Sequence, residues 1–304
     1  MLDPADLYQL SADVPPLGAP VLVQALDGFV DAGSVRQIVR QHLLGSFDSR
    51  GLARFAHDEL IDYRARRPPL TFVQDRWSAY DEPVLALHAL TDAGGTPFLL
   101  LAGPEPDIQW ERFAGAVMQL VDRLGVRLTI GLNAIPMAVP HTRPVGMTAH
   151  GTRPELVPKS ERWIDTVQVP SSAGNLLEYR LGAAGRDAIG FAVHVPHYLA
   201  QVEFAPAAQF LLEQVERASG LVLPAGELSA TADATLVSIA GQLADSAEVA
   251  AAVRALEVQY DAFVGGHGRG LLAEGRTSLP TADELGAELE QFLADQSRRP
   301  EGPD

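Results

Sequence analysis

The hydrophobic pattern of the chain changes near residue 200. Before that point, short apolar runs bounded by Gly, Pro or Asp alternate with segments in which apolar residues recur every three or four positions. The short runs predict strands. The longer segments predict a helix after the first strand and a crossover helix between the third and fourth strands. The strands are expected at residues 20–28, 84–90, 97–102, 127–134 and 188–195, and the helices at 32–44 and 108–124.

Strands that are apolar on both faces and joined by amphipathic helices are typical of a mainly parallel sheet covered on both sides. We therefore predict an α/β fold, a three-layer α/β/α sandwich, for residues 1–220. After residue 205 the strand pattern disappears, and residues 221–296 are predicted as a helical extension. The later helices are expected at 205–220, 230–245, 246–264 and 282–296, the last with a capping box of Thr281 and Glu284, before a disordered tail at 297–304.

A glycine-rich segment, residues 265–270, follows one of these predicted helices. It lacks the spacing of a dinucleotide-binding loop and does not follow a strand. We expect a flexible connection between two helices, with a ligand-contacting loop as the alternative.

Composition narrows the possible chemistry. The chain has 304 residues, a net charge of −16 and no cysteine, which excludes disulfides, thiolate zinc sites, iron–sulfur clusters and cysteine nucleophiles. Proteins bind nucleic acid largely through Lys and Arg contacts to its phosphates, so we do not expect such an acidic chain to bind nucleic acid. Lys159 is the single lysine, so a nucleotide grip built from paired lysines is excluded. We expect no cofactor.

The beginning of the chain lacks the positively charged segment of a secretory signal, and no apolar run is long enough to span a membrane. The sequence therefore predicts a cytoplasmic protein without membrane contact.

Ligands of open parallel sheets gather at the carboxyl ends of the strands, so candidate site residues are sought there. The loop after the first strand contains Asp27, Gly28, Asp31 and Gly33. These residues could admit a ligand to the helix N-terminus. Alternatively, Asp31 caps the helix while the glycines permit the turn and close packing.

Two further strand ends carry polar side chains. Asn133 lies at the end of one strand and His141 follows it, and His194 lies at the end of another strand with His197 after it. They could bind a polar group, or they could belong to ordinary strand exits. Pro196 separates the two histidines and argues against a helix there, so we expect no metal site.

A charged segment at residues 58–68 places three carboxylates before Arg64, Arg66 and Arg67. Arginines can bind a partner or a phosphate with paired hydrogen bonds. The alternative is a surface of mutually paired charges. Farther along, Asp107 is expected to cap the crossover helix and Glu105 to face the strand-end cleft.

Several segments, taken in order, resemble the PAC2 family, the proteasome assembly chaperone 2 group. The matching segments are 25–34, 58–68, 99–110, 131–143 and 191–204, and the later helices resemble the extension of actinobacterial members. The resemblance implies an α/β/α core related to phosphorylase/hydrolase-like folds and a homo-oligomer, with a trimer favoured. Some relatives help to assemble 20S proteasome α-subunits, and the resemblance makes this role an expectation for the present chain.

The leading hypothesis is a homo-oligomeric binding or scaffold protein without catalysis, a candidate proteasome-assembly factor. The alternative is a phosphorylase/hydrolase-type enzyme, or a small-molecule binder, that uses a cleft formed by Asp27, Asp31, Asn133 and His194. Some family members carry the label of ATP-dependent carboxylate–amine ligase. A single lysine and the lack of a nucleotide motif give that label little support here.

Overall fold

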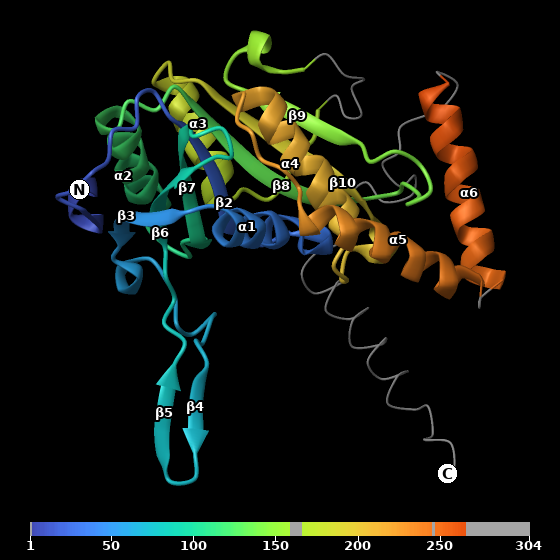
Figure 1. Ribbon diagram of the computed structural model, residues 1–304, viewed down its shortest axis with the longest axis horizontal. Helices are drawn as coiled ribbons and strands as arrows, with labels where there is room; N and C mark the ends of the chain where they lie inside the picture. The colour runs from blue at the N-terminus through green and yellow to red at the C-terminus, as the bar shows by residue number, and fades with distance from the viewer. Residues whose placement is uncertain (1, 159–165, 245–246, 266–304) are drawn as a thin grey trace.

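The computed structural model describes residues 2–158, 166–244 and 247–265. The predicted helix at 282–296 with its capping box, the tail at 297–304 and most of the glycine-rich segment lie outside these residues. Within them, the chain forms a three-layer α/β/α sandwich followed by helices (Figure 1).

The central sheet has eight strands in the order β1-β3-β6-β7-β2-β8-β10-β9. All five strands predicted from the apolar runs are present, and they form the middle of the sheet. They are β2 (Val21–Asp27), β6 (Ala86–Thr91), β7 (Pro97–Pro104), β8 (Leu128–Met137) and β10 (Ala188–Pro196).

The expectation of a mainly parallel sheet was wrong, because the sheet is mixed. The pairs β7–β2, β2–β8 and β8–β10 are parallel, whereas the pairs toward both edges are antiparallel. The edge strands β1 (Tyr8–Leu10) and β9 (Met147–Gly151), and β3 (Ser49–Phe55) next to β1, were not predicted. Exposed or half-buried positions interrupt these strands, so they lack the continuous apolar run of a buried parallel strand.

Four helices cover the sheet, two on each face. Helices α1 (Val35–Ser46) and α4 (Ala205–Ser219) pack on one face, and α2 (Trp110–Arg123) and α3 (Ala173–Ala183) on the other. Strand β2 shows how the faces divide, since Val21, Val23 and Ala25 belong to the core under α1 and α4. Leu22 and Leu26 belong to the opposite core. Both faces of the strand are buried, as its apolar run predicts.

Two C-terminal helices follow the sandwich, α5 (Glu227–Ala244) and α6 (Ala247–Val264) (Figure 1). Helix α5 packs against α4 and adds Leu228, Ala232 and Ile239 to the core on that face. Helix α6 contacts the loop after β8, where Tyr260 and Phe263 pack against Met137 and Val139. Arg143 of the same loop pairs with Asp261 at 2.7 Å. None of the helices in the described ranges is long and apolar enough to cross a membrane.

A separate two-stranded sheet leaves the body between β3 and β6. Its strands are β4 (Leu70–Val73) and β5 (Arg76–Tyr80), and they form a hairpin that projects from the sandwich (Figure 1). The charged segment at 58–68 leads into this hairpin.

Candidate functional site

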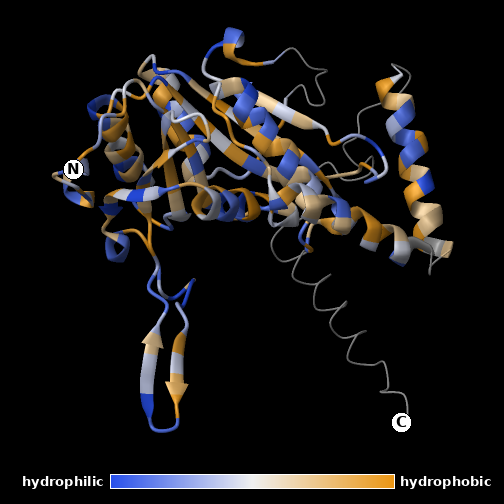
Figure 2. Cartoon of the chain, in the orientation of Figure 1, coloured by the Kyte–Doolittle hydropathy of each residue, from blue (hydrophilic) through white to orange (hydrophobic). Residues whose placement is uncertain are grey.

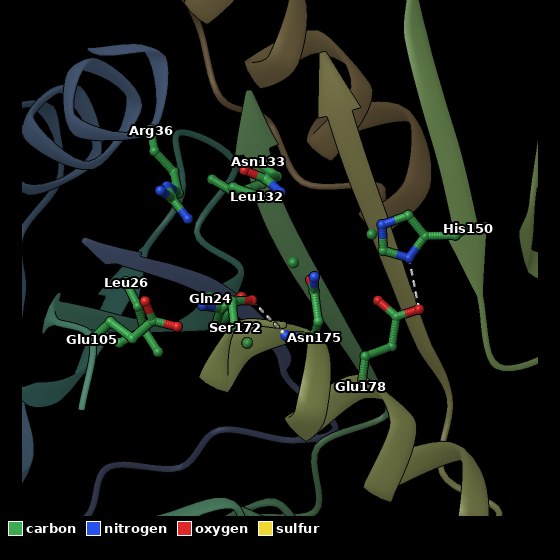
Figure 3. A pocket seen from close by; sticks show the side chains of 13 residues that line it. Gln24, Leu26, Arg36, Glu105, Leu132, Asn133, His150, Ser172, Asn175 and Glu178 are labelled. Atoms are coloured by element: carbon green, nitrogen blue, oxygen red, sulfur yellow. Dashed lines mark hydrogen bonds and ion pairs between the residues drawn. The ribbon is translucent and has the colours of Figure 1, made fainter. Parts of the chain in front are cut away.

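A row of register partners crosses four neighbouring strands. Gln24 of β2 pairs with Gly131 of β8, Gly131 with Gly190 of β10, and Gly190 with His150 of β9. The N-terminal half of α3 lies over this row, and a small cavity remains between helix and sheet (Figure 3). The row lies on the face of the sheet opposite α1 and α4.

Glycines allow this close approach of helix and sheet. A Cβ atom on Gly190 would lie 2.1 Å from His150 Cε1, and one on Gly174 of α3 would lie 2.9 Å from Gln24 Nε2. Above Gly190, His150 Nδ1 lies 2.7 Å from Glu178 Oε1 of α3 (Figure 3). The side chains that flank the glycines therefore occupy the space a Cβ would take.

Arg36 and Glu105 form the opposite wall of the cavity. Arg36 is only 7 % exposed and donates from Nη2 to the Val30 carbonyl at 2.6 Å. Burial lowers its pKa, and the charges of Asp31 and Glu105 oppose that shift. Glu105 accepts a hydrogen bond from the backbone amide of Ala173 at the start of α3. A carboxylate at this position stabilises the helix N-terminus.

The cavity is polar but very small. The Gln24 side chain is 5 % exposed, lines the cavity and makes no hydrogen bond with any described residue. The cavity volume is about 20 Å³, enough for about one water molecule. Pockets for metabolites usually measure about 300–1,000 Å³. The residues that gather here have no room for a substrate of that size in this conformation.

The carboxylates of the first strand–helix loop are engaged by α1. Asp31 accepts from the backbone amides of Arg36 at 2.9 Å and Gln37 at 3.1 Å, so it caps the helix. Burial raises the pKa of Asp31, and the Arg36 amide and guanidinium oppose that shift. Asp27 forms an ion pair with Arg40 of α1.

The two glycines of this loop have separate steric roles. Gly33 has a φ of 67°, and a Cβ there would lie 2.8 Å from Phe204 Cβ. Its carbonyl accepts from the Phe204 amide at 2.9 Å, which fixes the loop against the start of α4. Gly28 adjoins the cavity wall, since a Cβ there would lie 3.0 Å from Glu105 Oε2.

The predicted histidines lie apart from the cavity. His141 Nδ1 lies 2.7 Å from the Tyr198 hydroxyl, and burial lowers the pKa of His141. His194 is 1 % exposed, its Nε2 lies 2.9 Å from Thr148 Oγ1, and burial lowers its pKa to about 4. His197 is exposed.

Of the eight residues predicted for the cleft, Asn133 lines the cavity and Gly28 touches its wall. The remaining six lie in the surrounding loops and strands, so they do not form one cluster. In the ranges that the structure describes, no three His, Asp or Glu side chains are grouped as metal ligands.

Sequence reasoning missed Gln24, His150 and Glu178, although one signal was present. Gln24 is a polar residue between Leu22 and Leu26 on the same face of an otherwise apolar strand. An amide at such a position needs a partner or a cavity. His150 and Glu178 carried no comparable signal, because β9 and α3 were not predicted.

Of the three arginines proposed for partner binding, Arg66 is engaged within the chain. It pairs with Asp107 and donates to the Glu105 carbonyl. Asp107 therefore does not cap α2 as predicted, because its carboxylate holds Arg66 and the Asp62 amide. Arg64 and Arg67 are exposed.

Comparison with known proteins identifies the family. The PAC2 family model matches residues 25–243, most of the chain. The chain belongs to the PAC2 family. A solved structure of the Mycobacterium tuberculosis protein of unknown function Rv2714 has 48 % sequence identity and a TM-score of 0.82, covering 96 % of this chain and 97 % of that one.

Two other solved structures are similar to this PAC2 protein at lower identity. The M. tuberculosis proteasome-assembly chaperone homologue Rv2125 has 25 % identity and a TM-score of 0.69, with 77 % and 99 % of the chains covered. PbaB of Pyrococcus furiosus, an archaeal proteasome activator, shares the fold at 16 % identity and a TM-score of 0.56, with 77 % and 98 % covered. None of the curated proteins matches the chain.

The hairpin is the second notable surface of this PAC2 protein. Every residue of β4 and β5 is exposed, and Figure 2 shows hydrophobic residues along β4. Phe72 and Trp77 are 55 % and 65 % exposed, and their ring centroids lie 5.0 Å apart. Leu70 and Tyr80 form the pair nearest the body. Exposed apolar side chains gathered in this way mark interaction sites.

Proposed function

We propose that this PAC2 protein is a non-catalytic, self-associating binding protein with a chaperone-like role toward other proteins. The observation that carries the proposal is the β4–β5 hairpin, whose aromatic and aliphatic side chains are exposed on both strands. An isolated two-stranded hairpin is at best marginally stable in water. A hairpin of this composition is stabilised when a protein partner covers it.

The arrangement at the strand ends also favours binding over chemistry. Asp31 is used in capping, Asp27 pairs with Arg40, and Glu105 accepts from the start of α3. These carboxylates stabilise the fold, and the cavity that Glu105 lines has a volume of about 20 Å³. An enzyme of the phosphorylase or hydrolase type needs an open cleft at this place.

Two measurements test the proposal. Light scattering coupled to size-exclusion chromatography should give a mass above that of one chain, 32.5 kDa. A tagged protein mixed with purified 20S proteasome α-subunits, and separately with unfolded model clients, should retain at least one of them. A monomer that binds neither subunits nor clients would contradict the proposal. Retention of clients without α-subunits would support a chaperone-like role unrelated to the proteasome.

A second candidate function, binding of a small polar molecule, is favoured by one observation. The buried amide of Gln24 faces the cavity without a hydrogen-bonding partner among the described residues. Thermal-shift screening with phosphate, nucleosides and short peptides tests this function. Stabilisation that Gln24→Leu and Asn133→Ala both remove would favour it. No stabilisation of the wild type would leave the scaffold role as the sole proposal.

A further inference from the structure

Arg36 lies inside the protein with part of its hydrogen-bonding capacity unused. Its Nη2 donates to the Val30 carbonyl at 2.6 Å. Its Nε is buried without a hydrogen bond and lies 3.9 Å from Asp31 Oδ1, and its Nη1 makes no hydrogen bond with a described residue. A guanidinium has five N–H donors, and leaving a buried donor unpaired costs free energy. The side chain therefore suits an acceptor that reaches it through the cavity that it lines (Figure 3).

The three carboxylates that act on the charge of Arg36 are each engaged by another group. They are Asp31, held by backbone amides at the start of α1, Asp27, paired with Arg40, and Glu105, held by an amide at the start of α3. Burial lowers the pKa of Arg36, and the charges of these carboxylates oppose that shift. The positive ends of α1 and α3 offset part of the negative charge of Asp31 and Glu105. An arginine keeps its proton in proteins, so a cation with unused donors lines the cavity.

Gln24 adds a second polar side chain without a partner. It is 5 % exposed, it lines the same cavity, and no described residue forms a hydrogen bond with its amide. Asn133 is half-buried and Asn175 is exposed, so the cavity reaches solvent beside these two side chains (Figure 3). Each of the three amides carries two N–H donors. A ligand that enters past Asn133 and Asn175 therefore meets donors from several side chains.

The size of the cavity limits what can enter it. Its volume of about 20 Å³ has room for about one water molecule, so a whole metabolite does not fit. An end group fits, because one oxygen of a carboxylate can take the place of that water. A carboxylate also offers the acceptors that guanidinium and amide donors need, and hydrogen bonds to ionised groups are about twice as strong as neutral ones. The cavity therefore suits the carboxylate end of a longer ligand.

Apolar side chains are exposed on the loops around this end of the cavity. We call them the apolar collar, and they are Phe29, Val30, Ile108, Val167 and Val169, which are 36–74 % exposed. Their three loops meet at Glu105, whose amide donates to the Asp27 carbonyl and whose carboxylate accepts from the Ala173 amide. Exposed apolar side chains that gather in this way mark interaction sites. The apolar collar can cover the apolar part of a ligand whose carboxylate lies in the cavity.

We propose that this cavity binds the C-terminal carboxylate of an extended polypeptide whose last residues are apolar. Arg36 and Gln24 hold the carboxylate, and the apolar collar covers the apolar side chains next to it. A protein with a net charge of −16 repels a free anion, so contacts with the apolar collar have to supply part of the affinity. Chain ends are commonly poorly ordered, which makes them accessible on an unassembled protein. The inference rests on the binding role in the proposed function and names the chemistry of the partner.

Fluorescence anisotropy with three probes tests the partner's chemistry. The first probe is a rhodamine-labelled octapeptide that ends in Val-Leu with a free carboxylate, and the second is the same peptide amidated at its C-terminus. The amidated peptide should bind at least about tenfold more weakly, because it lacks the charge that pairs with Arg36. The third probe is unlabelled acetate, used as a competitor. Acetate should bind at least about 100-fold more weakly than the first peptide, because it lacks the apolar side chains.

Four variants of the full chain locate the binding. Arg36→Lys keeps a cation but loses the paired geometry of a guanidinium, and should reduce the difference between acid and amide peptides at least about fivefold. Gln24→Leu removes a cavity donor without removing a hydrogen bond between described residues, and should also reduce that difference. Phe29→Ser should weaken both peptides equally. Val237→Ser on α5 changes a side chain with the same 74 % exposure as Phe29 and should change neither peptide's affinity. Circular dichroism and thermal unfolding check that every variant folds.

Three results would overturn the inference. If acid and amide peptides bind equally, or if neither binds, the cavity does not hold a chain end. If acetate binds as tightly as the peptide, the cavity is a site for a small free carboxylate. If Arg36→Lys and Gln24→Leu bind as the wild type does, the peptide lies on another surface. Each of these results leaves the proposed function intact as long as the wild type retains α-subunits or unfolded clients. A wild type that binds neither would overturn the proposed function as well.

Discussion

Asp92 accepts a hydrogen bond from the backbone amide of Val222 at 2.7 Å, between residues 130 positions apart in the sequence. The other carboxylate oxygen accepts from the amides of Gly94 at 2.9 Å and Thr96 at 2.7 Å. Asp92 is 5 % exposed and lies in the turn between β6 and β7. One carboxylate therefore holds this turn and joins it to the segment after α4.

Replacing Asp92 should destabilise the protein. Asp92→Asn places an NH₂ group against a backbone donor in a buried site, which should lower the free energy of unfolding by about 2 kcal/mol. Urea unfolding measures the change. Asp6→Asn is the control, because Asp6 is exposed and its carboxylate has no hydrogen bond with another described residue. Equal stability of the two variants would contradict this role of Asp92.

His194 should make the protein less stable in acid. Its pKa is about 4 in the folded protein against 6.5 for the free side chain, so the unfolded chain takes up the proton first. The neutral form contributes its full stabilisation above pH 6.5, and this stabilisation is lost as the pH falls from 6.5 to about 4. The whole loss corresponds to about 3 kcal/mol.

Urea unfolding at a series of pH values between about 4.5 and 7.5 tests the linkage. His194→Gln should reduce the pH dependence of the free energy of unfolding by up to one proton. His197→Gln changes an exposed histidine and should leave that dependence as in the wild type. An unchanged pH profile in His194→Gln would show that this histidine is not the buried titrating group.

Two glycine substitutions should have opposite effects on stability. Gly103 has a φ of 127°, and a Cβ there would lie 2.1 Å from the Val84 carbonyl oxygen. Because the neighbour is backbone, Gly103→Ala should lower the free energy of unfolding by about 3 kcal/mol or more. Gly45 lies within α1, and a Cβ there meets no described atom within 4 Å. Gly45→Ala should therefore raise the free energy of unfolding by about 0.5–1 kcal/mol. Thermal unfolding of both variants provides the comparison.

Gln24→Leu should stabilise the protein. The buried amide has no hydrogen-bonding partner among the described residues, and a leucine would extend the apolar row of Leu22 and Leu26. We expect a gain of about 1 kcal/mol in the free energy of unfolding, measured with urea. Gln9→Leu, on the exposed side of β1, is the control and should change stability little. A loss in Gln24→Leu would indicate that water in the cavity satisfies the amide.

The centre of the sandwich follows from the local hydrophobic pattern. Continuous apolar runs predict β2, β7, β8 and β10, because strands buried on both faces require apolar residues at every position. The 3.6-residue period likewise predicts α1, α2 and α4, each of which packs one face on the sheet. The capping of α1 by Asp31 is also predictable, because Asp31 lies a few residues before the helix; it was one of the two interpretations of this loop.

Which polar residues meet depends on long-range strand pairing. Gln24, Gly131, Gly190 and His150 form one row because strand register aligns them, and register is set by long-range pairing that no local pattern records. For the same reason the candidate Asp31, Asn133 and His194 are separated, although each follows or ends a strand. The edge strands and the hairpin also depended on the structure, since partly exposed strands carry little hydrophobic periodicity.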